Sequence, residues 1–235
     1  MNKVYLLIFC LLLVGCSPSK ENWIDLFNGE NLEGWHTYGA GNTYDGWYIE
    51  NGVLIFDHQL RTNSRSSNLV TDSKYTNFEL SLDWNISNQG NSGIFWGVIE
   101  DKQFDHPYQT GPEIQILDDN WKEYIEVRGD INRAGSLYGL MAPSTIESKG
   151  AGIWNHYLIH IDHNKNIGYV EFNEKEVLRF PVHGPEWEAM ISKSGFADWP
   201  GFGKAKTGHI SLQEHGGKVS FKNIKIRILS GGDNL

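Results

Sequence analysis

The sequence predicts an all-β fold, a two-sheet jelly-roll sandwich formed by a single domain at residues 23–230. Apolar and polar residues alternate with a period of two in many short segments, whereas helical periodicity is scarce. The 235 residues include 26 Gly, 9 Trp, 10 Tyr and 11 Phe, which is typical of many short strands joined by turns. Turn-forming sequences such as Asn51-Gly52 and Gly216-Gly217 separate the alternating segments.

The chain begins with a segment that predicts export. Residues 1–15 contain Lys3 and an apolar run that is too short for a membrane-spanning helix, which needs about 20 apolar residues. The stretch Leu13–Cys16 resembles a bacterial lipobox, so we expect a signal peptide at 1–15, lipidation of Cys16 and a polar tether at 16–22. This places the protein at the cell envelope, anchored at the outer membrane or the periplasmic face. The alternative is an ordinary signal peptide with an incidental cysteine.

Cysteine content and charge exclude several classes. Both cysteines, Cys10 and Cys16, lie in the leader, so the mature domain has no disulfide framework and no thiolate site. The net charge of -9 argues against a nucleic-acid partner and is compatible with a neutral substrate such as a sugar.

The clearest strand is predicted at 77–84, where Phe78, Leu80, Leu82 and Trp84 share one face. A single short helix is expected at 185–192. Further strands are expected at 47–50, 53–56, 93–99, 113–117, 155–162, 168–172, 208–214 and 219–229.

Two strands carry polar residues that a core does not explain. Glu113 and Gln115 share one face about 6.6–6.8 Å apart, and a bulge after Gln115 would bring Asp118 to that face. On the strand at 208–214 and just beyond it, His209, Ser211, Gln213 and His215 lie opposite the core. The alternative for both strands is a solvated outer face. Aromatic residues that could line a cleft beside them are Trp96, Tyr108, Trp121, Tyr138, Trp199 and Phe202, of which we expect two or three to contact a ligand.

Several segments, taken in order, resemble a bacterial family named for 3-keto-disaccharide hydrolase or 3-keto-glucoside 1,2-lyase/hydratase activity. The similarity covers almost the whole mature chain and implies a concanavalin A-like fold. The segments are Trp23–Trp35, Phe78–Leu80, Gly90–Phe95, Pro112–Asp118, Gly135–Gly139, Trp154-Asn155, Gly208–Gly216 and Val219–Ile226. The chain departs from the family pattern at Trp96-Gly97, where an arginine is frequent, and at Glu214-His215-Gly216, where Asp-His-Gly is frequent.

The resemblance implies cleavage of 3-keto-glycosides by proton removal at C2, elimination at C1 and hydration. Such a reaction needs a base, an acid and a donor or metal at the developing oxyanion. Glu113 and His215 are the candidate base and acid, in either order. Candidate substrate-binding residues are Gln115, Asp118, Asn91, Tyr138, Gln213 and Trp96, with Tyr138 a further candidate acid. A divalent cation, Ca²⁺ or Mg²⁺, would suit an enolate, but the sequence names no ligand set.

Two other functions stay open at this stage. The spacing of Glu113, Gln115 and Asp118 matches the Glu-x-Asp-x-x-Glu motif of laminarinase-type glycosidases, although an amide replaces the middle acid. A sugar-binding lipoprotein without catalysis is the second alternative.

Overall fold

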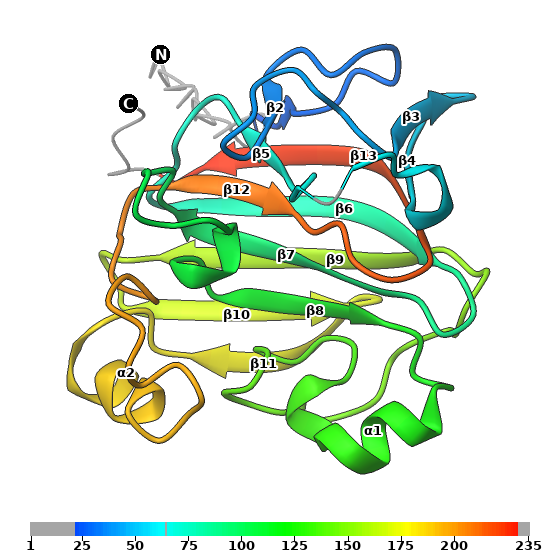
Figure 1. The fold of residues 1–235 in the computed structure, drawn as a ribbon. Coiled ribbons are helices and arrows are strands. Elements are labelled where there is room, and N and C mark those ends of the chain that lie inside the picture. Colours follow the sequence, from blue (N-terminus) through cyan, green and yellow to red (C-terminus); the bar gives the residue numbers. More distant parts are fainter. Residues whose placement is uncertain (1–21, 64, 230–235) are drawn as a thin grey trace, which may run out of the picture.

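Two antiparallel β-sheets pack face to face in the computed structural model, which describes residues 22–63 and 65–229 (Figure 1). The predicted two-sheet jelly-roll sandwich is therefore confirmed. The predicted signal peptide and Cys16 lie outside the described residues. Within the described ranges, none of the helices has the length and apolar character needed to cross a membrane.

The larger sheet has eight strands in the order β11-β10-β9-β6-β13-β4-β3, with β1 paired to β13. β13 is its longest strand, and its pairing with β1 places the two ends of the domain side by side. Its strands are β1 (Ile24–Asp25), β3 (Trp47–Glu50), β4 (Val53–Asp57), β6 (Phe78–Ile86), β9 (Asn155–Asp162), β10 (Ile167–Phe172), β11 (Lys175–Phe180) and β13 (Lys218–Ile228).

The smaller sheet has five strands in the order β2-β5-β12-β7-β8 and lies in front in Figure 1. Its strands are β2 (Trp35–Thr37), β5 (Leu69–Thr71), β7 (Asn91–Val98), β8 (Glu113–Leu117) and β12 (His209–Leu212). Strands far apart in the sequence thus become neighbours, because β12 pairs with both β5 and β7.

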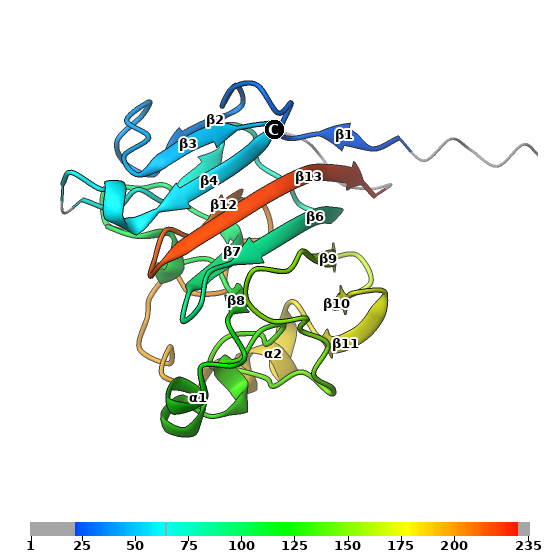
Figure 2. The ribbon, with the colours of Figure 1, turned by 90° about the vertical axis from the view of Figure 1, so that its right-hand side faces the viewer.

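Both α-helices, α1 (Lys122–Arg128) and α2 (Gly184–Ile191), lie at the edge of the sandwich formed by β8 and β11 (Figures 1 and 2). Short 3₁₀ turns occur at η1 (His58–Leu60), η2 (Pro107–Gln109) and η3 (Asp130–Asn132). The predicted helix at 185–192 corresponds to α2. Helix α1 was not predicted, and the expectation of a single helix was wrong.

The inward faces of the two sheets form the core. Leu80, Leu82 and Trp84 on β6 are almost fully buried and meet Ile94 on β7 and Ile114 on β8 within one apolar cluster. Alternation along β6 leaves Glu79, Ser81 and Asp83 on the opposite face, as the period of two predicts. Between β3 and β4, Asn51 and Gly52 have φ of 52° and 77°, the left-handed pair that a tight two-residue hairpin requires.

The outer face of the larger sheet holds a self-contained ionic cluster. Glu79 Oε1 lies 3.0 Å from His160 Nδ1, and its second oxygen pairs with Arg227. The hydrogen bond from His160, with Arg227 adding to it, lowers the pKa of Glu79 to about 2. These contacts link three neighbouring strands, β6, β9 and β13.

Candidate active site

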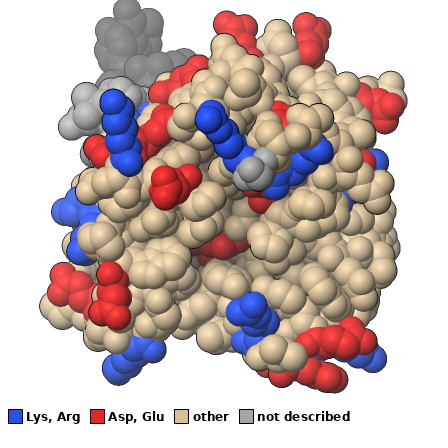
Figure 3. All heavy atoms as spheres, viewed as in Figure 1, with Lys and Arg blue, Asp and Glu red and all other residues tan. Residues whose placement is uncertain are grey.

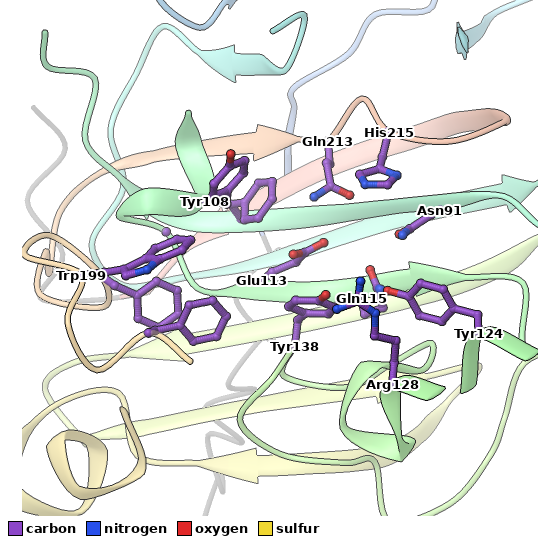
Figure 4. A pocket seen from close by; sticks show the side chains of 14 residues that line it. Asn91, Tyr108, Glu113, Gln115, Tyr124, Arg128, Tyr138, Trp199, Gln213 and His215 are labelled. Atoms are coloured by element: carbon purple, nitrogen blue, oxygen red, sulfur yellow. The ribbon is translucent and has the colours of Figure 1, made fainter. Parts of the chain in front are cut away.

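The outer face of the smaller sheet is hollowed into a pocket of about 350 Å³, within the size range of small-molecule sites (Figure 3). Strands β7, β8 and β12 form its floor, and α1 and the segment after α2 contribute to its walls (Figure 4). The lining residues are Asn91, Phe95, Tyr108, Gly111, Glu113, Gln115, Tyr124, Arg128, Tyr138, Phe196, Trp199, Phe202, Gln213 and His215.

Glu113 lies on the floor of this pocket, and the neighbouring strand leaves space for its side chain. Gly93 on β7 pairs with Gln115, and a Cβ on Gly93 would lie 1.9 Å from Glu113 Oε1. Only glycine at position 93 therefore lets the Glu113 carboxyl lie across β7 toward the centre of the pocket.

Burial dominates the electrostatics of Glu113. The side chain is 7% exposed, and among the described residues no group donates a hydrogen bond to its carboxyl. Because charge is disfavoured away from water, burial raises the pKa of Glu113 to about 8. The carboxyl is therefore mostly protonated at neutral pH and can donate a proton.

His215 lies just beyond the end of β12, where the chain stays paired to β7. Gln213 donates its backbone N–H to the carbonyl of Gly93 at 2.8 Å, and Asn91 donates to the carbonyl of Gly216 at 2.9 Å. These bonds hold the exposed His215 ring at the rim, near Asn91 (Figure 4). His215 keeps an exposed surface, but desolvation of its ring by the surrounding protein, and to a smaller extent His58, lowers the pKa of His215 from 6.5. The imidazole is therefore neutral at pH 7 and can accept a proton.

Two buried glutamines present acceptors to the pocket. Gln115 donates Nε2–H to the carbonyl of Asn132 at 3.3 Å, which leaves its Oε1 without a partner. Gln213 Oε1 also has no partner. Because buried acceptors are costly unless they are satisfied, these two oxygens fit the hydroxyl groups of a polyol ligand.

Tyr138 reaches the pocket because its segment pairs with the free edge of β8. Tyr138 donates its backbone N–H to the carbonyl of Glu113 at 2.9 Å, and Gln115 donates to Ser136 at 3.1 Å. The Tyr138 hydroxyl hydrogen-bonds to Tyr124. Burial is the main cause that raises the pKa of Tyr124 above 10.0, and this hydrogen bond is the second cause.

Helix α1 supplies two residues that sequence reasoning missed. Tyr124 and Arg128 both face the pocket, and the Arg128 guanidinium carbon lies 6.0 Å from the centre of the Tyr124 ring. Their i,i+4 spacing, with Trp121 one turn earlier, is the signal that could have identified this face. Arg128 is a positively charged donor in the wall opposite His215 (Figure 4).

Aromatic rings close the opposite end of the pocket. Phe196 stacks on Phe202 with centroids 4.1 Å apart, and Trp199 meets both rings edge-on. Tyr108 lies 5.8 Å from Trp199 and completes this group. Tyr108, Tyr138, Trp199 and Phe202 were among the six aromatic candidates, whereas Phe196 was not.

Two predicted binding residues lie elsewhere. Trp96 points into the core, where it packs 5.7 Å from Phe180, because its position on β7 alternates with the pocket-facing Phe95. Asp118 is fully buried after the end of β8, and its carboxylate accepts backbone N–H groups from Gln89 at 3.0 Å and Asn120 at 3.1 Å. β8 has no bulge in its pairing with β7, so Asp118 does not rejoin the face of Glu113. Neither position fits contact with a substrate.

Two other residues near the site are committed to structural contacts. Glu214 turns away from the pocket and accepts a hydrogen bond from Arg61 at 2.8 Å. Trp121 stacks 4.9 Å from Tyr124 behind the pocket wall and is not part of the lining.

Residues 22–227 match the family described as the 3-keto-alpha-glucoside-1,2-lyase-like domain. The chain belongs to this family. It is 29% identical over 231 residues to the 3-keto-disaccharide hydrolase of Bacteroides thetaiotaomicron. The matched region covers 89% of this chain and 79% of that protein.

Two crystal structures from Parabacteroides distasonis, each described as a candidate glycosyl hydrolase, are similar in fold. One has a TM-score of 0.82 and 30% identity, covering 89% of this chain and 95% of the other. The second has a TM-score of 0.64 and 27% identity, covering 88% of this chain and all of the other, 100%.

In this member of the lyase-like family, Glu113 is the only Asp or Glu among the described residues that line the pocket. Across residues 22–63 and 65–229, no group of three or more His, Cys, Asp or Glu side chains is arranged to hold a metal ion. The side chains that line the pocket therefore supply acid–base groups and amide oxygens. A bound Ca²⁺ or Mg²⁺ ion stays a sequence-based prediction.

Proposed function

We propose that this pocket cleaves 3-keto-glycosides by elimination followed by hydration. The family is named for this substrate class, and its relative from Bacteroides thetaiotaomicron is named a 3-keto-disaccharide hydrolase. The observation that carries the proposal is the opposite displacement of two pKa values in one pocket, since that of Glu113 is raised and that of His215 is lowered. An acid and a base thus coexist at neutral pH.

These protonation states assign the roles. A ketone at C3 makes the C2 proton acidic, so the neutral His215 imidazole removes it and the electron pair moves onto O3 as an enolate. When the enolate collapses, the C1–O bond breaks, and Glu113 gives its proton to the leaving oxygen. The sugar is now an enone with a C1–C2 double bond.

Hydration completes the reaction. The Glu113 carboxylate takes a proton from water while the hydroxide adds at C1, and the imidazolium of His215 returns a proton to C2. The product is the free 3-keto sugar, both groups regain their starting states, and the net change is hydrolysis.

Polar groups around Glu113 suit the remaining needs of this reaction. The unpartnered oxygens of Gln115 and Gln213 accept hydrogen bonds from sugar hydroxyls, and Asn91 adds a third amide at the same end. The Arg128 guanidinium and the Tyr138 hydroxyl are donors for the developing negative charge on O3.

The roles are tested with Glu113→Gln and His215→Ala assayed on a 3-keto-glucoside. General acid–base groups contribute roughly 10²–10⁴-fold, so we expect each variant to lose at least about a hundredfold in kcat. Glu176→Gln and His156→Ala, which change matched side chains on the larger sheet, serve as controls and should keep full activity. Full activity in Glu113→Gln and His215→Ala would refute the assignment.

The two alternative functions are less well supported. A retaining glycosidase needs two carboxyl groups about 5–5.5 Å apart, whereas the described lining offers Glu113 alone. If the protein only bound sugars, the shifted pKa values of Glu113 and His215 would have no role. Recovery of an unaltered 3-keto-disaccharide after incubation, with measurable affinity, would favour that module.

Anchoring at the cell envelope is proposed from the sequence alone. The lipobox-like Leu13–Cys16 supports a lipid anchor at Cys16, which would hold the sandwich at a membrane surface through the tether at 16–22.

A further inference from the structure

The two ends of the pocket differ in chemistry. All of its amide side chains, its histidine and its arginine gather at one end, around Asn91, Gln115 and Gln213 (Figure 4). At the other end the lining consists of rings, and Trp199 and Tyr108 face Glu113 from that side (Figure 4). Glu113 thus lies at the boundary between a polar end and an aromatic end.

The aromatic end is a preformed wall. Phe196 and Phe202 stack nearly parallel, with an interplanar angle of 13°, and Trp199 stands at 88° to Phe202. The backbone of this segment is fixed where Gly203 donates to Thr110 at 2.8 Å and accepts from Trp187 Nε1 at 2.8 Å. Its shape therefore does not depend on a ligand to order it.

This wall offers few polar groups. Phe196 and Phe202 have none, so the Tyr108 hydroxyl and the Trp199 indole N–H are the only side-chain donors of the four rings. A sugar bound there would leave most of its hydroxyl groups without side-chain partners, which is costly for a ligand taken out of water. A flat apolar group instead gains by contact with the rings.

We propose that the aromatic end binds an aromatic aglycone, so that the preferred substrates are 3-keto-glucosides of aromatic alcohols. This inference rests on the proposed function, which places the 3-keto sugar at the polar end. The scissile C1–O bond then lies at the boundary, beside the carboxyl of Glu113 that protonates the leaving oxygen. The position of Glu113 between the two ends suits that role (Figure 4).

The test compares benzyl and ethyl 3-keto-glucosides of the same anomeric configuration, whose leaving alcohols are both alkyl alcohols. We expect kcat/KM to be about tenfold higher for the benzyl substrate, because one aromatic contact is worth roughly that factor. Trp199→Ala and Phe196→Ala should each lower kcat/KM for the benzyl substrate more than for the ethyl substrate and so remove most of this preference, whereas Trp199→Phe should retain much of it. Trp154→Ala is the matched control, since Trp154 lies under Lys222, away from the pocket.

The outcomes separate the two proposals. Failure to cleave either substrate would overturn the proposed function. Cleavage of both at equal rates, unchanged in Trp199→Ala, would overturn the aromatic-aglycone proposal alone. A 3-keto-disaccharide preferred over the benzyl substrate and weakened by Trp199→Ala would show that the wall stacks a second sugar, and would also overturn it. Calorimetry with unoxidised benzyl and ethyl glucosides gives a readout without turnover, and the benzyl compound should lose more affinity than the ethyl compound in Trp199→Ala.

Discussion

Desolvation shifts the pKa values of Glu113 and His215 in opposite directions, because one is an acid and the other a base. Removing water disfavours the charged form of each, so the pKa of Glu113 rises and that of His215 falls. At neutral pH both are uncharged. The proton donor and the proton acceptor of the proposed elimination are therefore prepared by the same physical effect.

The pH dependence of kcat/KM follows from these shifts. Activity needs a neutral His215 and a protonated Glu113, so it should rise with pH through a limb below pH 6.5 and fall through a limb near pH 8. Glu113→Gln cannot lose a proton in this range, so its residual activity should lack the alkaline limb. An unchanged alkaline limb in Glu113→Gln would show that another group titrates there.

Stability should respond to Glu113 in the opposite sense to activity. The folded-state pKa of about 8 lies above the ordinary value of 4.5, so the contribution of Glu113 to stability is complete below pH 4.5 and is lost as the pH rises toward 8. Each unit of pKa shift corresponds to at most about 1.4 kcal/mol. We expect Glu113→Gln to be more stable than wild type at pH 8 and nearly equal at about pH 5 in urea unfolding. Equal stability at both pH values would argue that the carboxyl is not desolvated.

At the level of elements, the close approach of β7 and β8 sets the position of the acid. In Gly93→Ala the added Cβ would overlap Oε1, Cδ and Cγ of the buried Glu113 side chain, so the whole side chain must move. We therefore expect kcat to fall by about tenfold or more and the unfolding midpoint to fall as well, because overpacking costs roughly 1–3 kcal/mol. Gly195→Ala, where a Cβ meets nothing within 4 Å, is a control that should change neither quantity. Full activity in Gly93→Ala would mean that the position of the carboxyl is not critical.

The strands were predictable because their alternation is local. The expected segments at 47–50, 113–117 and 155–162 coincide with β3, β8 and β9. β11 was missed because Lys175–Phe180 buries Val177 and Leu178 in succession and so breaks the alternation. Helix α1 was missed because none of its residues is fully buried, and its Tyr124 and Arg128 serve the pocket instead of the core.

Across the whole molecule, the sequence predicted the sandwich, and six of its eight catalytic and substrate-binding candidates line the pocket, but it could not supply their arrangement. Asn91, Gln213 and His215 come together because β12 inserts between β5 and β7, and strand order is not encoded in local alternation. Trp96 and Asp118 were misplaced for local reasons. Alternation with Phe95 puts Trp96 on the inward face of β7, and β8 ends before Asp118 without the expected bulge.

The proposed membrane anchor is also tested on the whole chain. Cys16→Ser should abolish labelling with a radioactive fatty acid and move the protein from the membrane fraction to the soluble fraction, because several acyl chains are needed for stable attachment. Cys10→Ser changes the other cysteine of the leader and should leave both results unaffected. Membrane association that persists in Cys16→Ser would refute lipidation at this residue.

Deuterium incorporation at C2 distinguishes the proposed elimination from direct hydrolysis. A 3-keto-glucoside is cleaved in deuterium oxide, followed by NMR, and corrected for exchange in an enzyme-free control. Elimination and hydration predict a transient enone and, because the exposed imidazolium of His215 exchanges its proton with solvent before returning it, a product that carries deuterium at C2. A product that retains its original C2 proton, formed without an enone, would contradict the mechanism and indicate direct hydrolysis.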